Sequence, residues 1–301
     1  MKFLYLLENI RFPLLDELML LITQLGEETA FLAVALIVFW CVDKRRGYYI
    51  MAVGFVGTIF NQFLKLLCRV PRPWILDPNF KPVEGSVEAA TGYSFPSGHS
   101  QSSVGTFGAL AVTVKQKVLR CLLIAICVLV PLSRMYLGVH TPADVLVGAL
   151  CAVALIFGFR FILNGKNLKP MMLIMACISV FFLIFVQFLL NPQNLDAHNY
   201  ASGLKNAYTL LGSIFGVLVV YFVDEKWVHF EVKAIWWAQL LKIAGGIGLV
   251  LLVKSGLKTP LDALFGEYPG RTVRYFLIVM VAGVLWPLTF KWFSRLGKKE
   301  K

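Results

Sequence analysis

Long apolar segments recur along the whole chain, and they decide what it can fold into. Of its 301 residues, 58% are hydrophobic and only 15% are charged, and the mean hydropathy is +0.73. A soluble domain carries about 25% charged residues, whereas a helix that crosses a bilayer needs roughly 20 mostly apolar ones. The apolar runs are continuous, without the alternation of β-barrel strands. The sequence therefore predicts an all-α, polytopic bundle of transmembrane helices.

These segments indicate about nine spans. They cover residues 27–43, 47–67, 99–115, 118–136, 142–163, 170–190, 203–223, 236–256 and 272–293. Residues 3–25 are also apolar but contain four charged side chains, Glu8, Arg11, Asp16 and Glu17. This charge content is typical of an interfacial or re-entrant helix rather than of a tenth span. We therefore expect an N-terminal helix (1–26), a membrane core (27–163), and additional transmembrane helices with a basic tail (164–301).

Basic residues are concentrated in alternate connections between the spans. More than half of the 29 Lys and Arg residues fall near residues 44–46, 115–120, 160–169, 226–233 and 291–301. An excess of Lys and Arg marks cytoplasmic loops, so we expect the N-terminus outside and the C-terminus in the cytoplasm. The same rule accounts for the net charge of +12 without a nucleic-acid partner. The expected location is the plasma (inner) membrane, as a multi-pass protein.

The six cysteines give no sign of a disulfide framework. They lie in or beside apolar runs, and none has CxxC spacing. Such cysteines usually behave as small buried hydrophobic residues. We therefore expect six free, buried thiols.

The first polar motif is KLLCRVPRP, which begins at Lys65. An ionisable side chain at membrane depth is costly and is a functional candidate by default. A lysine at the end of a span also commonly extends to the interface, so both interpretations of Lys65 stay open. Arg72 lies between two prolines, which restrict the backbone around its guanidinium, and this favours a binding role.

The second motif is PSGH, residues 96–99, at the start of a predicted span. Ser97, Gly98 and His99 would form the first helical turn. Free backbone N–H groups there can bind an anion, and glycine lets the anion approach closely. A plain serine cap beside a partly buried histidine is the alternative.

The third motif is SRMYLGVHTPAD, which ends at Asp144. Arg134 offers a planar donor fork suited to phosphate. The stretch TPAD is a typical helix start with threonine as the N-cap, so Asp144 can be interpreted as a cap alone. The same turn brings Asp144 near His140. A carboxylate there can keep one imidazole nitrogen protonated and leave the other free to attack.

The predicted topology brings the three motifs to one external face of the membrane. Together they offer three permanent cations, a helix N-terminus, two histidines and a carboxylate. Such a set suits phosphoryl transfer, because cations neutralise phosphate oxygens while one group attacks and another protonates the leaving oxygen.

In order, these residues read K-x6-R-P, P-S-G-H and S-R-x5-H-x3-D. On this signature the chain resembles the type 2 phosphatidic acid phosphatase superfamily, which shares its site with vanadium haloperoxidases and glucose-6-phosphatase. The resemblance covers about residues 27–163 and gives little information about the remainder.

The resemblance implies a role for each residue of the signature. His140 would be the nucleophile that forms a phosphohistidine, Asp144 would orient it, and His99 would protonate the leaving group and then activate water. Five residues would bind the phosphate, namely Lys65, Arg72, Ser97, Gly98 and Arg134. The resemblance implies no metal and no other cofactor.

The substrate stays open at this stage. A site at the outer ends of the spans favours a lipid phosphate, of the undecaprenyl diphosphate, phosphatidic acid, phosphatidylglycerophosphate or sphingosine-1-phosphate type. The span number and outward N-terminus are similar to those of glucose-6-phosphatase, so a soluble sugar phosphate is the alternative. A vanadate-dependent oxidase and a non-catalytic lipid-phosphate carrier are further alternatives, but a carrier would not need two histidines and a carboxylate together. The sequence carries no signal for an oligomeric state.

Overall fold

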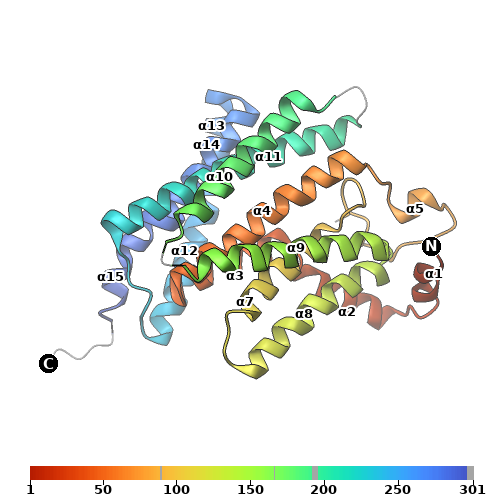
Figure 1. Ribbon diagram of the computed structural model, residues 1–301, viewed down its shortest axis with the longest axis horizontal. Helices are drawn as coiled ribbons and strands as arrows, with labels where there is room; N and C mark the ends of the chain where they lie inside the picture. Colours follow the sequence, from red (N-terminus) through yellow and green to blue (C-terminus); the bar gives the residue numbers. More distant parts are fainter. Residues whose placement is uncertain (89, 166, 192–195, 297–301) are drawn as a thin grey trace. The chain divides into compact units, whose positions relative to one another are not determined.

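The chain folds into helices joined by turns and loops, the longest of which connects α5 (Pro73–Leu76) to α6 (Gly98–Ser103) (Figure 1). The computed structural model describes residues 1–301 except 89, 166, 192–195 and 297–301. Within these residues no strand occurs. In the same part of the chain, seven helices are long and apolar enough to cross a membrane, or up to eight when a bent helix pair counts as one span. The predicted all-α transmembrane architecture is therefore confirmed, with slightly fewer spans than the nine expected.

The seven long helical segments agree with seven of the predicted spans. They are Lys44–Leu76, Lys117–Tyr136, Pro142–Leu163, Lys169–Leu189, Ala197–Val228, Trp236–Gly256 and Glu267–Phe293. The other two predicted spans are shorter helices. Residues 27–43 correspond to α3 (Glu28–Cys41), which has 14 residues, and residues 99–115 to a run that begins at Gly98 and ends at Ala111. Neither reaches the roughly 17 residues that a single perpendicular span needs.

The N-terminal segment is helical but not a continuous span. It contains α1 (Lys2–Glu8) and α2 (Pro13–Gln24). Helix α2 meets α3 at a bend of 49°, as in a broken span or a re-entrant segment. Pro13 at the first position of α2 suits a helix start, because its missing N–H has no intrahelical partner there.

The chain divides into two compact units, each of which we describe by itself. The first consists mainly of Met1–Ala35 and Tyr49–Asn164, and the second contains Leu36–Tyr48 and most of the chain after Gly165. The further helices of the first unit are α4 (Lys44–Cys68, from Tyr49 onward), α5 (Pro73–Leu76), α6 (Gly98–Ser103), the π-helical η1 (Val104–Gly108), α7 (Ala109–Ala111), α8 (Lys117–Tyr136) and α9 (Pro142–Leu163). Those of the second are α10 (Lys169–Ile184), η2 (Phe185–Leu189), α11 (Ala197–Val223), η4 (Asp224–Val228), α12 (Trp236–Gly256), α13 (Lys258–Phe265), α14 (Glu267–Met280), η5 (Val281–Leu285), η6 (Pro287–Thr289) and α15 (Phe290–Phe293).

In the first unit, α6 packs against both α8 and α9, and α2 packs against α8 (Figure 1). Two glycines permit this packing. A Cβ atom on Gly148 of α9 would lie 2.5 Å from the carbonyl oxygen of Ser97, so only glycine allows α9 to approach the start of α6 this closely. Gly138, in the turn between α8 and α9, has a φ of +78°, which glycine adopts without strain.

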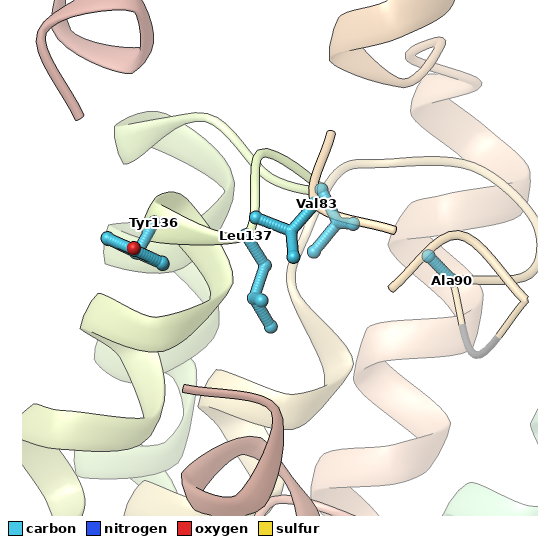
Figure 2. Close-up of a cluster of buried hydrophobic side chains, with 5 residues drawn as sticks. Val83, Ala90, Tyr136 and Leu137 are labelled. Atoms are coloured by element: carbon cyan, nitrogen blue, oxygen red, sulfur yellow. The ribbon is translucent and has the colours of Figure 1, made fainter. Parts of the chain in front are cut away.

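A buried apolar cluster fixes the loop between α5 and α6 against the turn that follows α8 (Figure 2). Val83 and Ala90 of the loop pack with Tyr136, Leu137 and Val139. The backbone N–H of Val83 also donates to the carbonyl of Leu137, at 3.0 Å. Fully burying a large apolar side chain contributes about 1.5–3 kcal/mol. The loop residues that follow Ala90 are thereby anchored close to the α8–α9 turn.

The second unit contains a buried lysine that is hydrogen-bonded to backbone carbonyl groups. Lys242 of α12 is fully buried, and its Nζ donates to the carbonyls of Trp40 at 2.9 Å and Val232 at 3.0 Å. Trp40 lies in the last turn of α3, where carbonyl groups have no intrahelical donor and a cation is favourable. Among the described contacts, the ammonium group of Lys242 therefore caps the C-terminal end of α3.

The predicted burial of the cysteines is wrong. All six are free thiols, but Cys68, Cys121 and Cys177 are exposed and the other three are only half-buried. In a membrane protein an apolar position can face lipid as well as the interior, since lipid tails are as apolar as the core. An apolar neighbourhood in the sequence therefore does not imply burial in this protein.

Candidate active site

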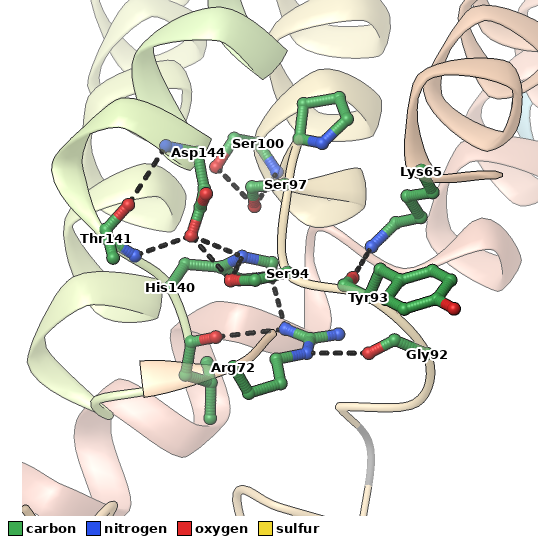
Figure 3. A network of polar contacts seen from close by, with 12 residues as sticks. Lys65, Arg72, Gly92, Tyr93, Ser94, Ser97, Ser100, His140, Thr141 and Asp144 are labelled. Atoms are coloured by element: carbon green, nitrogen blue, oxygen red, sulfur yellow. Dashed lines mark hydrogen bonds and ion pairs between the residues drawn. The ribbon is translucent and has the colours of Figure 1, made fainter. Parts of the chain in front are cut away.

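The three polar motifs lie together in the first unit, around the imidazole of His140 (Figure 3). Lys65 is in the last turn of α4, and Arg72 is the N-cap of α5. Ser97 is the N-cap of α6, and Asp144 is in the first turn of α9. Residues far apart in the sequence thus become neighbours because helices end and begin at the same place.

His140 is held from both ring nitrogens. It is only 2% exposed, and its Nε2 lies 2.9 Å from NH1 of Arg72. Arginine has no acceptor atom, so Nε2 must accept this hydrogen bond and carry the free electron pair. In the neutral ring Nδ1 then bears the proton, and it lies 3.5 Å from Oδ2 of Asp144. This is the tautomer that leaves Nε2 available for attack.

Asp144 makes the contacts that both interpretations of the sequence expect, a helix cap and a carboxylate beside His140. Its Oδ2 accepts from the backbone N–H of Thr141 at 2.7 Å, and its own N–H donates to Oγ1 of Thr141 at 3.3 Å. This is a complete capping box at the start of α9. The same Oδ2 also faces His140 and accepts a 2.6 Å hydrogen bond from the hydroxyl of Ser94. Capping therefore fixes the carboxylate in the position where it faces the imidazole.

Arg72 is positioned by backbone carbonyl groups. It is 4% exposed, and it donates to the carbonyls of Thr91 at 2.8 Å, Gly92 at 3.0 Å and Val139 at 2.9 Å. These acceptors come from the anchored loop and the α8–α9 turn. The guanidinium consequently has one defined orientation beside His140.

Lys65 is buried beside the same loop. Its Nζ donates to the carbonyl of Tyr93 (Figure 3), and the residue is 9% exposed. A lysine that extended to the membrane interface would have its ammonium in water. The observed position favours the site interpretation of Lys65 over the interfacial one.

The PSGH motif starts α6 beside α9. The hydroxyl of Ser97 caps the helix by accepting from the N–H of Ser100 at 3.3 Å and also accepts from its hydroxyl at 2.9 Å. The backbone N–H of Ser97 donates to the carbonyl of Asp144 at 2.9 Å. Nε2 of His99 is buried without a hydrogen-bond partner in the described chain. The serine cap is therefore present, and the histidine next to it has a ring nitrogen free for another group.

Arg134 is buried almost completely, with 1% exposure. Its NH1 donates to the hydroxyl of Thr23 at 2.8 Å, while its Nε has no partner among the described residues. Buried polar groups are normally hydrogen-bonded. The unpartnered Nε of Arg134 can therefore donate to a bound anion, and Nε2 of His99 can also bond to a ligand.

The electrostatic environment keeps His140 neutral. Burial lowers the pKa of His140 well below its ordinary value, and the positive charges of Arg72, Arg134 and Lys65 lower it further. Both effects disfavour the imidazolium. At neutral pH the ring is therefore uncharged, which a nucleophilic nitrogen requires.

Sequence reasoning missed two side chains and several backbone groups of the site. Ser94 is fully buried, with its hydroxyl 2.6 Å from Asp144 and 3.5 Å from Nδ1 of His140. Thr23 belongs to the N-terminal segment, where only the charge content was informative. The carbonyl acceptors for Lys65 and Arg72 exist in any sequence, so no residue type could have indicated them.

The described residues contain no group of three or more His, Cys, Asp or Glu side chains that could hold a metal ion. The donor set around His140 is dominated by cations and hydrogen-bond donors. Such a set fits an anion.

Two family models match the chain. The PAP2 superfamily model matches residues 45–167, which include all the signature residues. A second model, described as PAP2 superfamily phosphatase, transmembrane extension, matches residues 208–299. No solved structure matches the chain significantly.

Curated proteins similar to the chain include two from Bacillus subtilis and one from Rattus norvegicus. Undecaprenyl-diphosphatase BcrC of Bacillus subtilis is 31% identical over 166 residues, which are 52% of this chain and 78% of that protein. Phosphatidylglycerophosphatase B of the same organism is 30% identical over 163 residues, 49% of this chain and 75% of that protein. Glucose-6-phosphatase catalytic subunit 1 of Rattus norvegicus is 25% identical over 246 residues, 70% of this chain and 62% of that protein. With the apolar helices, these matches identify the chain as a multi-pass membrane phosphatase that belongs to the PAP2 superfamily.

Proposed function

We propose that the protein hydrolyses the phosphate monoester or diphosphate of a membrane lipid through a phosphohistidine intermediate on His140. One observation carries this proposal: Nε2 of the buried His140 accepts from Arg72 while its Nδ1 faces Asp144. The names of the bacterial relatives support a lipid substrate of the undecaprenyl diphosphate or phosphatidylglycerophosphate type. Phosphatidic acid and sphingosine-1-phosphate belong to the same chemical class.

In the first step, Nε2 of His140 attacks phosphorus, and the bond between phosphorus and the leaving oxygen breaks. The electron pair that Nε2 offers to Arg72 in the free protein is the one that forms the P–N bond. The N–H of Arg72 then turns to a phosphate oxygen. Asp144 stabilises the positive charge that develops on the ring, as the orienting carboxylate of a catalytic triad does.

His99 supplies the proton that the leaving oxygen needs. The negative charge of the bound phosphate offsets the three cations that disfavour a protonated ring, so that His99 can act as the general acid. The neutral ring that results then takes a proton from water. The hydroxide attacks phosphorus, the P–N bond breaks, and orthophosphate leaves with both histidines restored. The buried, unpartnered Nε2 of His99 supports this role.

The phosphate oxygens are bound by Lys65, Arg72 and Arg134, with Ser97 and Gly98 adding donors at the start of α6. Three cations in a buried site stabilise the charge of the transition state strongly, because water does not screen them. We therefore propose a reaction that needs no metal ion. The charge balance that a metal would otherwise supply comes from these three side chains.

We place the site at the non-cytoplasmic face of the membrane. The basic connections favour a cytoplasmic location for the opposite ends of the helices. The proposed topology has the N-terminus outside and the C-terminus inside. In this proposal residues 1–26 are interfacial or re-entrant, residues 27–163 form the phosphatase core, and residues 164–301 are additional helices and a basic tail.

Phosphate release by the purified protein in the presence of EDTA tests the proposal. The panel contains undecaprenyl diphosphate, phosphatidylglycerophosphate, phosphatidic acid, sphingosine-1-phosphate and glucose-6-phosphate. We expect release from at least one lipid, its loss in His140→Ala, and no loss in the control His198→Ala, since His198 is exposed and lies outside the signature. A strict requirement for a divalent cation, or full activity of His140→Ala, would contradict the mechanism.

A soluble sugar phosphate is the second candidate. The similarity to glucose-6-phosphatase catalytic subunit 1 extends over 246 residues, further than the similarity to either bacterial relative. Release from glucose-6-phosphate but from none of the lipids would favour this candidate. Binding of a lipid with no release from any substrate would instead indicate a carrier.

A further inference from the structure

The N-terminal helices contact two residues of the phosphatase signature. Thr23, in the last turn of α2, accepts a 2.8 Å hydrogen bond from NH1 of Arg134. Gly26, in the turn between α2 and α3, lies against His99. Both residues precede the region that the PAP2 superfamily model matches, which begins at residue 45.

We propose that Thr23 is a positioning residue of the active site, which orients the guanidinium of Arg134 toward the phosphate. The segment that contains α1 and α2 is then part of the catalytic unit. This inference rests on the proposed function, since it assumes that Arg134 binds the phosphate of the substrate.

The geometry of the guanidinium gives Thr23 its effect. A guanidinium is planar and presents its donors in a rigid fork. Fixing NH1 on the Thr23 hydroxyl, which is itself only 5% exposed, restricts rotation of the whole plane. The Nε–H, which has no partner in the described chain, is thereby held in one direction. A phosphate oxygen can then be bound without the entropy cost of ordering a free arginine.

Polar contacts near the end of α8 hold the N-terminal segment in place. Arg11 donates from Nε and NH2 to the carbonyl of Tyr136, at 3.1 and 2.9 Å. The hydroxyl of Tyr136 donates to Asp16 at 2.7 Å. Tyr136 is only two residues from Arg134 in the last turns of α8. The end of α8 that α2 contacts is therefore the end that supplies the phosphate-binding cation.

Apolar packing reinforces this contact. Leu15, Met19 and Leu20 of α2 pack against the cluster that contains Tyr136 and Leu137. These contacts place α2 along α8, and they determine where its last turn, with Thr23, comes to lie. The position of Thr23 therefore depends on the whole segment and not on one hydrogen bond.

Gly26 shows how closely the segment approaches the motif. A Cβ atom there would lie 2.8 Å from Cγ1 of Val130 and 2.9 Å from Cβ of His99. No side chain fits this space without displacing its neighbours. The turn between α2 and α3 thus covers the first turn of α6 directly.

The test compares Thr23→Val, which removes the hydroxyl and keeps the shape, with Thr23→Ser, which keeps the hydroxyl. Orthovanadate binding to the full-length protein is the first readout, because vanadate occupies a phosphate site without turnover. Hydrogen bonds that involve a charged group contribute enough for about a tenfold to hundredfold effect. We expect the vanadate Kd to rise by this factor in Thr23→Val and to stay near the wild-type value in Thr23→Ser. The control is Thr113→Val, which removes a hydroxyl that bonds to the carbonyl of Leu110 at 2.8 Å.

A double-mutant cycle separates positioning from general destabilisation. In an Arg134→Ala background, Thr23→Val should not change the vanadate Kd further, because the group that it positions is gone. Equal effects of Thr23→Val in both backgrounds, or a wild-type Kd in Thr23→Val, would overturn the inference. The proposed catalytic role of His140 is tested separately by turnover of His140→Ala, so either idea can fail while the other stands.

Discussion

At the residue scale, the chemistry of the site depends on which nitrogen of His140 carries the proton. Arg72 can only donate, so its 2.9 Å contact with Nε2 fixes the tautomer. The proton on Nδ1 then faces Asp144 and the hydroxyl of Ser94. The distance from Nδ1 to Asp144 is 3.5 Å, which is long for a hydrogen bond, whereas Ser94 bonds to the carboxylate at 2.6 Å. Ser94 therefore helps to fix the carboxylate that orients the nucleophile.

Ser94→Ala should slow the chemical step. It removes the 2.6 Å hydrogen bond from the Ser94 hydroxyl to Oδ2 of Asp144 and leaves the capping bond from the Thr141 N–H to hold that oxygen beside His140. Removing a hydrogen bond to a charged group corresponds to roughly a tenfold to hundredfold fall in kcat. The control is Ser86→Ala, which affects another buried serine of the same loop, whose hydroxyl bonds to the carbonyl of Val83. Similar falls in kcat for both variants would show that loop stability alone is affected.

His140 should make the folded protein sensitive to acid. Its pKa is lowered in the folded state by burial and by the charges of Arg72, Arg134 and Lys65, whereas an unfolded histidine titrates near about 6.5. Below that pH the unfolded state binds a proton that the folded state resists, so stability decreases as the pH falls.

Thermal unfolding in detergent between about pH 5 and pH 7.5 measures this effect. We expect the Tm of the wild type to decrease on acidification more steeply than that of His140→Asn, which cannot titrate at this position. Parallel curves for the two proteins would mean that the pKa of His140 is the same in the folded and unfolded states. The acid limb of kcat/KM should likewise lie below the ordinary titration of histidine.

At the scale of the elements, the site depends on how closely helices approach one another. The start of α6 lies against α9 because Gly148 has no side chain, and a Cβ atom there would be 2.5 Å from the carbonyl oxygen of Ser97. The neighbouring atom belongs to the backbone and cannot rotate away. The distance between α6 and α9 is therefore fixed at the point where the PSGH motif meets Asp144.

Gly148→Ala should displace the start of α6 and lower both activity and stability. Forcing an extra methyl group into a packed interior costs about 1–3 kcal/mol. Gly158→Ala is the matched control on the same helix, because a Cβ atom there has no neighbour within 4 Å, and alanine has the higher helix propensity. Turnover and Tm measured for both variants should separate them. An unimpaired Gly148→Ala would mean that the two helices can move apart without effect on the site.

At the scale of the whole molecule, the proposed topology places the loop after α5 and the start of α8 on opposite sides of the membrane. Asn79 and Lys117 are exposed representatives of these two positions. A cysteine-free protein with Asn79→Cys should react with a membrane-impermeant thiol reagent applied to intact cells. Lys117→Cys should react only after permeabilisation. The reverse pattern would place the site on the cytoplasmic side.

The PAP2 superfamily region and the transmembrane extension match different parts of the chain, residues 45–167 and 208–299. Every residue of the signature lies in the first region, and the buried Lys242 of the second unit is occupied by helix capping. The division into an N-terminal helix, a phosphatase core and additional helices remains our proposal. The contacts of Thr23 and Gly26 indicate that the first of these parts belongs functionally with the core.

The sequence by itself determined the fold class and the residues of the signature. Long apolar runs require helices in a bilayer, since every backbone polar group must be satisfied within the segment. The signature contains the residue types that phosphoryl transfer needs. These residues, such as Arg72 and His140, can be identified from the sequence alone. Most helix ends were also predicted to within a few residues, as for Pro142–Leu163 and Trp236–Gly256, whereas the helix predicted at 203–223 begins at Ala197.

Only the tertiary structure decided how these side chains are held. The carbonyls of Gly92 and Val139 orient Arg72, and backbone carbonyls are present at every position of any sequence, so no pattern identifies them. Ser94 and Thr23 have ordinary hydroxyls that become important only because folding brings them to Asp144 and Arg134. The sequence also did not show which face of each helix packs inside the protein and which faces lipid, because an apolar side chain is equally favourable in either environment.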